Sequence, residues 1–364
     1  MGPRARSLRR AGLRYGRPIV VSTVAGLALL VLTRPDWADN VVNFTFHTFQ
    51  DSRAVTVLAP LGSLDKDFTD RTGLRLRFGV DAISAASDGC VRCHPQGRGM
   101  QRTYFGAALV RKLNDWKLNV GSEISRENFY ASDTLMASIT RDFNKGNTTI
   151  AGGYSYSSNR PKLHPSDNIE HQSSQDAYVS LTQTLSKTTI VQFTYDVNQV
   201  KGYQSSPFLR TNVNGVMVLG NVPDARTRQA FSVRLRQALP ASTYLEADVR
   251  RYSDTWSIGS NTFSLGLSHE FGPSLLIGGN YRWYTQTGAS FYQPFYVGDP
   301  LYYTGDFRLE PFNSGQISGR IAITPELGFW GMPKGSTFSV EYQRYSATNR
   351  FAAATLSAGV KVPF

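Results

Sequence analysis

Hydrophobic and polar residues alternate along most of the chain after Asn40. In the segment 191–198, valine, phenylalanine and tyrosine occupy the odd positions, whereas glutamine, threonine, aspartate and asparagine occupy the even ones. Successive side chains of a β-strand point to opposite faces, so this period predicts strands with one apolar and one polar face. The segments 116–125, 231–236 and 356–362 show the same pattern, and no sustained helical period follows the first 38 residues. The fold is therefore predicted to be all-β.

A soluble β-sandwich also alternates, so the nature of the polar face matters. The alternating segments are about ten residues long, which suits a strand that crosses a bilayer at a tilt. Their polar faces carry charges of both signs, as the wall of a water-filled lumen does. These lumenal charges include Arg234, Arg236, Glu246, Asp248, Arg250 and Arg282. This charge pattern favours a membrane barrel over a secreted sandwich.

Aromatic residues gather near the ends of the predicted strands, as in the interfacial girdles of membrane barrels. They are Trp116, Tyr252, Trp256, Tyr281, Trp283, Tyr284, Phe329, Trp330 and Tyr345. Lipid does not tolerate an open sheet edge, because unpaired backbone groups have no water to bind. We therefore predict a closed transmembrane antiparallel β-barrel.

The links between the predicted strands fall into two interleaved classes. The short links are Thr69–Gly73, Asn114–Asp115, Asn144–Asn147, Ser186–Thr188, Pro240–Ser242 and Glu270–Pro273. The long links are Ser87–Arg102, Ser157–Ser174, Gly202–Arg226 and Thr287–Phe312. Outer-membrane barrels have short periplasmic turns and long outer loops, so the count of segments predicts about sixteen strands. Short outer links near Asp51 and at Ser346–Arg350, and a long inner one at Pro325–Gly335, depart from this rule.

The first 38 residues differ from the rest of the chain. Arginines precede an apolar run, Ile19–Leu32, and the small residue Ala38 follows Pro35. This order predicts a secretory signal peptide over 1–38; the alternative is a single membrane anchor, which needs about 20 apolar residues. The segment contains seven arginines and one aspartate, so residues 39–364 keep only half of the formal charge of +12. They contain no basic tract, and no nucleic-acid partner is predicted.

Several short motifs resemble those of an outer-membrane barrel family of Gram-negative bacteria known only as a domain of unknown function. The motifs are Phe49–Arg53, Val80–Ser87, Pro223–Gln229, Tyr252–Trp256 and Ser290–Tyr292. In addition, the C-terminal Phe364 resembles the terminal aromatic signal that the barrel assembly machinery reads. The resemblance implies a barrel over 39–364 in the outer membrane of a Gram-negative bacterium, in contact with its lipid bilayer. It implies no reaction or substrate, and because no nucleophile elbow is present we do not expect an enzyme.

One motif carries specific chemistry. The run Cys90-Val91-Arg92-Cys93-His94 contains the only two cysteines of the chain and one of its five histidines. This spacing is that of c-type haem attachment, in which two thiols reach the two vinyl groups of one porphyrin. The resemblance to c-type cytochromes implies that Cys90 and Cys93 form thioethers with haem c and that His94 is the proximal iron ligand. The topology predicts that this haem-motif loop, 86–102, lies at the outer end of the barrel.

Two other interpretations of the motif are open. In an oxidising compartment, Cys90 and Cys93 can form a structural disulfide and do nothing further. A zinc site is also conceivable, but one cysteine pair and one histidine leave a zinc tetrahedron incomplete. If haem is bound, the distal ligand is sought among the residues predicted at the outer end. These are Met100, His164, His171 and His47, the last on the lumenal face because Phe44 and Phe46 take the opposite one.

Two functions follow from these patterns. The first is an outer-membrane electron-transfer protein with one covalent haem. A single haem cannot span a hydrocarbon layer about 25 Å thick, so this function requires a periplasmic or extracellular cytochrome or a small redox protein as partner. The second is a porin or an outer-membrane assembly or transport protein with a structural disulfide. In either case, Arg234, Arg236 and Arg250 beside Glu246 and Asp248 form an ion-paired wall or a selectivity constriction.

Overall fold

The computed structural model describes residues 40–364 except 54, 84–99, 164–165, 167 and 328–330. The predicted signal peptide, 1–38, therefore lies outside the described residues. All strands belong to one compact unit, Trp37–Pro363. Only two short 3-10 turns interrupt the β-structure of the described part, η1 (Asn144–Gly146) and η2 (Phe307–Leu309). In this part of the chain, no helix is long and apolar enough to cross a membrane.

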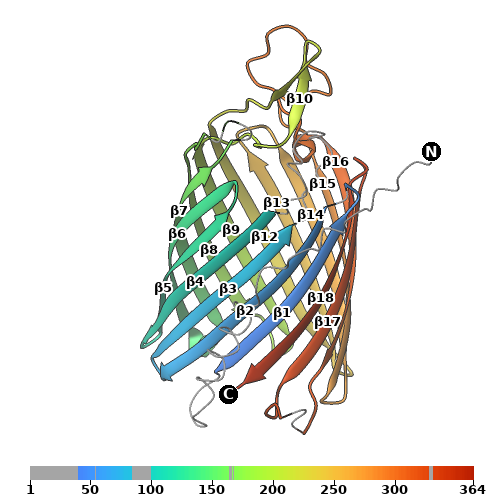
Figure 1. Ribbon diagram of the computed structural model, residues 1–364. Coiled ribbons are helices and arrows are strands. Elements are labelled where there is room, and N and C mark those ends of the chain that lie inside the picture. The colour runs from blue at the N-terminus through green and yellow to red at the C-terminus, as the bar shows by residue number, and fades with distance from the viewer. Residues whose placement is uncertain (1–39, 54, 84–99, 164–165, 167, 328–330) are drawn as a thin grey trace, which may run out of the picture. The chain divides into compact units, whose positions relative to one another are not determined.

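Sixteen antiparallel strands form one closed barrel (Figure 1). They are β1 (Val41–Asp51), β2 (Thr56–Thr69), β3 (Thr72–Ile83), β4 (Met100–Leu113), β5 (Trp116–Glu127), β6 (Tyr130–Phe143), β7 (Thr148–Pro161), β8 (Gln172–Thr184), β9 (Thr189–Gly202), β12 (Ala225–Leu239), β13 (Thr243–Asp254), β14 (Gly259–Phe271), β15 (Leu275–Gln286), β16 (Phe312–Ile323), β17 (Thr337–Ala347) and β18 (Ala352–Pro363). Each strand pairs with the next barrel strand in the chain, and β1 closes the sheet by pairing with β18. The predicted all-β closed barrel of about sixteen strands is confirmed.

The outer surface of the barrel is apolar because alternate residues of each strand face outward. In β6, Leu135 is 66% exposed and Ile139 is also exposed, whereas Thr134 and Ser138, on the opposite side of the strand, face the lumen. The same division runs through the other strands, and no large hydrophobic side chain is fully buried among the described residues. An apolar surface of this extent is stable only in contact with lipid, so the barrel spans a membrane.

The two ends of the barrel differ in the length of their links. The inner end carries tight turns such as 70–71, 114–115 and 240–242, as well as the longer link 324–336. The outer end carries the long links, which are 84–99, 162–171, 203–224 and 287–311. The predicted division is confirmed, with two further tight outer turns at 128–129 and 255–258 that the sequence pattern did not reveal.

Three of the aromatic residues predicted in the girdles do face lipid. Tyr281 and Trp283 lie on the exposed side of β15, and Trp116 lies at the inner end of β5. Beside it, the Arg141 guanidinium lies 4.8 Å from the centre of the Trp116 ring and 4.6 Å from that of Phe143. Such cation–π contacts between apolar rings and a charge suit the boundary between hydrocarbon and headgroups.

Other members of the predicted girdles are placed differently, and that part of the prediction was wrong. Tyr252, Tyr284 and Tyr345 fall on the lumenal side of their strands. Trp256 is only 4% exposed, because three outer links enclose it in a small core. The core residues are Val222, Trp256, Ile258, Ala289 and Leu309. Phe329 and Trp330 lie outside the described residues.

The links 203–224 and 287–311 pack together at the outer end, and we call them the outer crown (Figure 1). The first contains a separate hairpin, β10 (Arg210–Val213) and β11 (Val216–Leu219). Its turn residues Asn214 and Gly215 have positive φ of 53° and 85°, which asparagine and glycine tolerate best. Backbone hydrogen bonds of 2.8 Å in both directions join Asn221 to Tyr303 of the second link. The two links therefore form one hydrogen-bonded unit.

A buried ion pair fixes the base of the outer crown. The Asp254 side chain is fully buried, and it accepts hydrogen bonds from Arg226 Nε at 3.0 Å and from the Tyr252 hydroxyl at 2.6 Å. Its Oδ1 accepts the backbone N–H groups of Trp256 at 2.8 Å and Ile258 at 3.0 Å, which holds the turn 255–258 in shape. Asp254 thus connects the last residues of β13 to the core beneath the crown.

A second polar contact lies within the crown itself. The Tyr292 hydroxyl donates to Glu310 Oε2 at 2.9 Å. Burial is the main cause that raises the pKa of Tyr292 above its ordinary value, and this hydrogen bond to the carboxylate raises the pKa further. The tyrosine therefore stays protonated and keeps this contact across the physiological pH range.

Candidate functional site

The haem-motif loop joins β3 to β4. Cys90, Cys93 and His94 lie outside the described residues, and so does His164. Ile83 and Met100 are paired across β3 and β4, so the loop leaves and re-enters the sheet at neighbouring positions. Because this link belongs to the outer set, both of its ends lie at the outer rim of the barrel.

The remaining predicted distal ligands occupy three separate places. Met100 is the first residue of β4, on the side of that strand that faces the lumen. His47 faces the lumen from β1, as predicted, and its Nδ1 lies 2.6 Å from Ser357 Oγ. His171 is exposed just before β8, which is four strands from β4 and thus about 19 Å away along the wall. Met100 therefore adjoins the end of the loop, whereas His47 and His171 lie on or beside other strands.

A charged cluster that sequence reasoning missed lies on the lumenal wall at the base of the loop. Arg102 forms an ion pair with Asp81 at 3.7 Å, and its Nε donates to Ser125 Oγ at 2.9 Å. Its guanidinium also lies 5.3 Å from the centre of the Tyr104 ring. Asp81 and Arg102 are directly opposite each other and form the next lumen-facing pair after the loop ends. An arginine so held offers a fixed cation to an anionic group near the outer rim.

The predicted charges of β12 and β13 form an ion-paired wall. Arg236 Nε lies 2.7 Å from Glu246 Oε2, and Arg234 Nε lies 3.3 Å from Asp248 Oδ2. These residues face each other directly across the two strands, so their pairing follows from the register. Arg250 comes next along the same wall, with its guanidinium 5.7 Å from the centre of the Tyr252 ring. Such half-exposed pairs add little stability, but they fix charges of both signs along the lumen.

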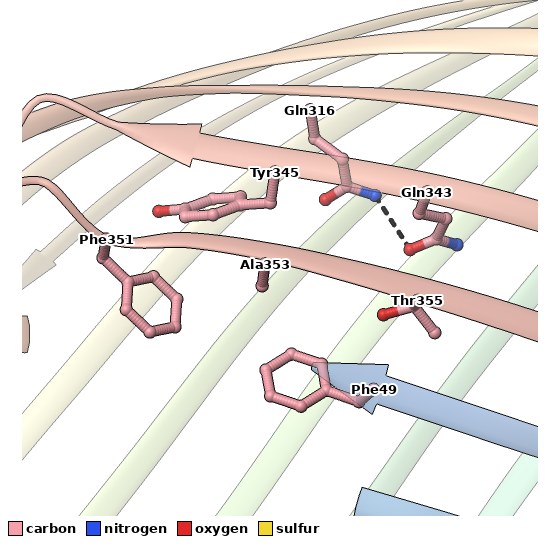
Figure 2. A pocket seen from close by; sticks show the side chains of 7 residues that line it. All are labelled: Phe49, Gln316, Gln343, Tyr345, Phe351, Ala353 and Thr355. Carbon is pink, nitrogen blue, oxygen red and sulfur yellow. Dashed lines mark hydrogen bonds between the residues drawn. The ribbon is translucent and has the colours of Figure 1, made fainter. Parts of the chain in front are cut away.

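A pocket with a volume of about 220 Å³ opens on the lumenal side of β1, β16, β17 and β18 (Figure 2). Its lining residues are Phe49, Gln316, Gln343, Tyr345, Phe351, Ala353 and Thr355. Gln316 Nε2 donates to Gln343 Oε1 at 3.1 Å, and Figure 2 shows this pair of amides beside the aromatic rings. The rings of Tyr345 and Phe351 meet edge to face, with their centres 5.9 Å apart. Aromatic rings next to amides allow weak contacts with small polar molecules.

The sequence comparisons assign the family. A family model described as "Protein of unknown function (DUF3570)" matches residues 98–165 and 160–361, which is more than half of the chain. The chain belongs to the DUF3570 family. No curated protein matches the sequence.

The DUF3570 match covers only part of the resemblance noted in the sequence. The motifs 223–229, 252–256 and 290–292 lie within the matched residues, whereas 49–53 and 80–87 precede them. Cys90, Cys93 and His94 also precede the matched residues, so membership of the family neither supports nor opposes haem attachment.

Several solved structures of Pseudomonas proteins are similar to the DUF3570 barrel at low sequence identity. OpdK from Pseudomonas aeruginosa, solved with vanillate, is 8% identical, with 90% of this chain and 98% of that chain covered and a TM-score of 0.46. A BenF-like porin from Pseudomonas fluorescens Pf-5 is also 8% identical, with 90% of this chain and 98% of that chain covered and a TM-score of 0.46. The siderophore receptor PirA from Pseudomonas aeruginosa is 13% identical, with 86% of this chain and 57% of that chain covered and a TM-score of 0.45.

The location of the DUF3570 barrel follows from its own architecture. It has an even number of strands, short inner turns, long outer links and an apolar outer surface. Bacterial outer-membrane barrels combine these features. The protein is an outer-membrane β-barrel of a Gram-negative bacterium, and the lipid bilayer is its immediate environment.

Proposed function

We propose that this DUF3570 barrel is an outer-membrane electron-transfer protein that carries one covalently bound c-type haem on the link between β3 and β4. The observation that carries the proposal is the run Cys90-Val91-Arg92-Cys93-His94, which contains the only two cysteines of the chain. Cys90 and Cys93 would hold the porphyrin through thioethers, and His94 would be the proximal ligand. A bound haem supplies one-electron transfer.

Two features of the described residues support this proposal. The paired positions Ile83 and Met100 hold both ends of the link at the outer rim. Just below, Arg102 is fixed by Asp81 and Ser125 and provides a cation of the kind that binds carboxylates such as haem propionates. Among the described residues proposed as distal ligand, Met100 is favoured because it adjoins the link, whereas His47 is already hydrogen-bonded to Ser357.

The proposal requires a redox partner. The apolar band of such barrels is about 25 Å tall, so a single haem at the outer rim leaves the periplasmic end without a redox centre. We therefore expect a periplasmic or extracellular cytochrome, or a small redox protein, to dock at one end of the barrel. Electrons would pass between the haem and this partner.

The direct test is whether the protein carries covalent haem. Full-length protein is co-expressed with a c-type haem maturation system, purified in detergent and separated on a denaturing gel. Haem held by two thioethers survives denaturation and extraction with acid and organic solvent, so a haem-stained band at the mass of the barrel is expected. An unstained band under these conditions contradicts the proposal, and a thiol count then shows whether Cys90 and Cys93 are oxidised.

A second function, passage of polar solutes, is supported by a different observation. The lumen carries the ion-paired wall of β12 and β13 and the amide-lined pocket of Figure 2. Both are exposed to any solute that passes along the barrel axis. This function requires no haem, and Cys90 and Cys93 would then form a structural disulfide in an outer link.

Charge reversal on the lumenal wall tests the solute pathway. If ions pass the wall of β12 and β13, the double change Arg234→Glu and Arg236→Glu should shift selectivity toward cations, because two charges change sign and the local net charge falls by four units. The measurement is the reversal potential of single channels in a planar bilayer under a salt gradient. The control is Arg344→Glu, since Arg344 lies on the lipid-facing side of β17 with Tyr342. Equal reversal potentials in the double variant and the wild type would contradict a solute pathway along this wall.

A further inference from the structure

Three charged residues interrupt the apolar outer surface at the outer ends of three neighbouring strands. Arg126 is on the lipid-facing side of β5, Asp133 on that of β6 and Arg160 on that of β7. The same sides carry apolar residues closer to the middle of the membrane. Those exposed apolar residues are Val120, Ile124, Leu135, Ile139, Ile150, Tyr154 and Tyr156. We call Arg126, Asp133 and Arg160 the outer triad.

One carboxylate holds both arginines of the outer triad. Asp133 Oδ1 lies 2.5 Å from Arg126 Nη2, and Asp133 Oδ2 lies 2.6 Å from Arg160 Nη2. Arg126 is held further by donating from Nη1 to the carbonyl oxygens of Ser132 at 2.8 Å and Ser125 at 2.9 Å. Among the described residues, the ion pairs of Arg126 and Arg160 both go to Asp133, so the triad keeps a net positive charge.

The register places the backbones of the two arginines on either side of a small residue. Arg126 and Arg160 are both paired with Ala131 on the central strand, so their backbones are two interstrand spacings apart, about 10 Å. The side chain between them is only the methyl group of Ala131. The side chains of Arg126, Asp133 and Arg160 are 47%, 37% and 37% exposed, so the guanidinium groups are accessible from outside the barrel.

The position along the strands places the triad at the level of the headgroups. Trp116 marks the inner boundary of the apolar band, and Arg126 lies ten residues further along β5. A rise of about 3.3 Å per residue at a tilt of about 40° gives a height of about 25 Å. This equals the height of the hydrocarbon band in such barrels, so the triad lies where the outer leaflet changes from acyl chains to headgroups.

We propose that the outer triad binds a phosphate group of a phosphorylated glycolipid of the outer leaflet. A cation that faces lipid is costly unless it meets water or an anion, and the anion at this depth is a lipid phosphate. Arginine suits it because its planar guanidinium donates several hydrogen bonds to phosphate oxygens. Asp133 holds the two guanidinium groups together at one carboxylate. The exposed rings of Tyr154 and Tyr156 lie further toward the middle of the membrane, against the acyl chains.

The test compares lipid retention by matched variants of the full-length barrel. The proteins are wild type, Arg126→Gln with Arg160→Gln, Asp133→Asn, and Arg344→Gln as a control outward arginine near the outer end of β17. Binding of diphosphorylated lipid A, of its dephosphorylated form and of inorganic phosphate is measured by native mass spectrometry in detergent. The shift of the unboiled band on a gel confirms that each variant is folded.

We expect the wild type and the Arg344→Gln variant to bind diphosphorylated lipid A equally, and the double arginine variant to bind about tenfold more weakly. Asp133→Asn should bind more tightly than the double variant, because both guanidinium groups remain. Equal binding by the wild type and the double variant would overturn the proposal. So would equal binding of the dephosphorylated lipid, or a loss in Asp133→Asn as large as that of the double variant, which would mean that the triad only joins strand ends. Displacement of the lipid by an equimolar amount of inorganic phosphate would assign the site to free phosphate instead.

Discussion

A Cys93→Ser variant is expected to lose, or to show only faintly, the covalent haem band that the wild type shows after co-expression with a c-type maturation system. Serine cannot form the second thioether, so the porphyrin keeps at most one covalent link to the chain. A His94→Ala variant should also be matured poorly, because the iron loses its proximal ligand. The measurement is haem staining on a denaturing gel, normalised to total protein.

The control for this experiment is Arg92→Ala, which keeps both thiols and the histidine. Its band should match that of the wild type. Barrel assembly should be intact in all three variants, because the sheet pairing of β3 and β4 ends at Ile83 and Met100. A haem band of normal intensity in Cys93→Ser would show that the haem is attached elsewhere and would contradict the assigned role of Cys93.

Replacing Asp254 with alanine is expected to release the outer crown while the barrel stays closed. The change leaves Arg226, whose side chain is only 10% exposed, without its ionic partner. Breaking a buried ion pair in this way costs about 3–5 kcal/mol. The backbone N–H groups of Trp256 and Ile258 also lose their acceptor, and both residues belong to the core that supports the crown.

Limited proteolysis of the folded protein in detergent measures this effect. Cleavage within 203–224 or 287–311 should be much faster in the Asp254→Ala variant, whereas the gel shift of the closed barrel should persist. Asp299→Ala is the matched control, since Asp299 lies in the same crown but is exposed. Cleavage at the same rate in all three proteins would show that the crown does not depend on Asp254.

The alternation of side chains was sufficient to predict the barrel and the direction of many side chains. His47 faces the lumen, as the alternation of side chains along β1 predicted. Arg234 pairs with Asp248, and Arg236 pairs with Glu246, across two neighbouring strands. These features depend on residues close in sequence and on one repeated period. The Arg102 cluster is an intermediate case. The alternation places Asp81 and Arg102 on the lumenal face. Their pairing, however, depends on the register of β3 against β4 across the loop 84–99, which no local pattern gives.

The outer end was predicted less well because its structure depends on contacts between distant segments. Trp256 resembled a girdle residue, yet its burial arises from Val222 and Leu309, which belong to other links. The β10–β11 hairpin was treated as part of a long loop, although Asn214-Gly215 between short apolar segments is a recognisable turn signal. The outer triad was missed for a different reason. Its residues lie at the outer ends of the lipid-facing sides of their strands. One charged residue at such an end does not change the alternation of apolar and polar positions.

The pairing of β1 with β18 closes the barrel wall. Eleven residue pairs, from Val41 with Pro363 to Asp51 with Ala353, join the first and last strands over the whole of β1. This seam has no shortened stretch among its described residues, so the wall is continuous where the first and last strands meet. If solutes use the interior, as proposed above, they would enter or leave along the barrel axis and not through this seam. The redox partner that we propose would likewise approach from one of the two aqueous compartments that the membrane separates.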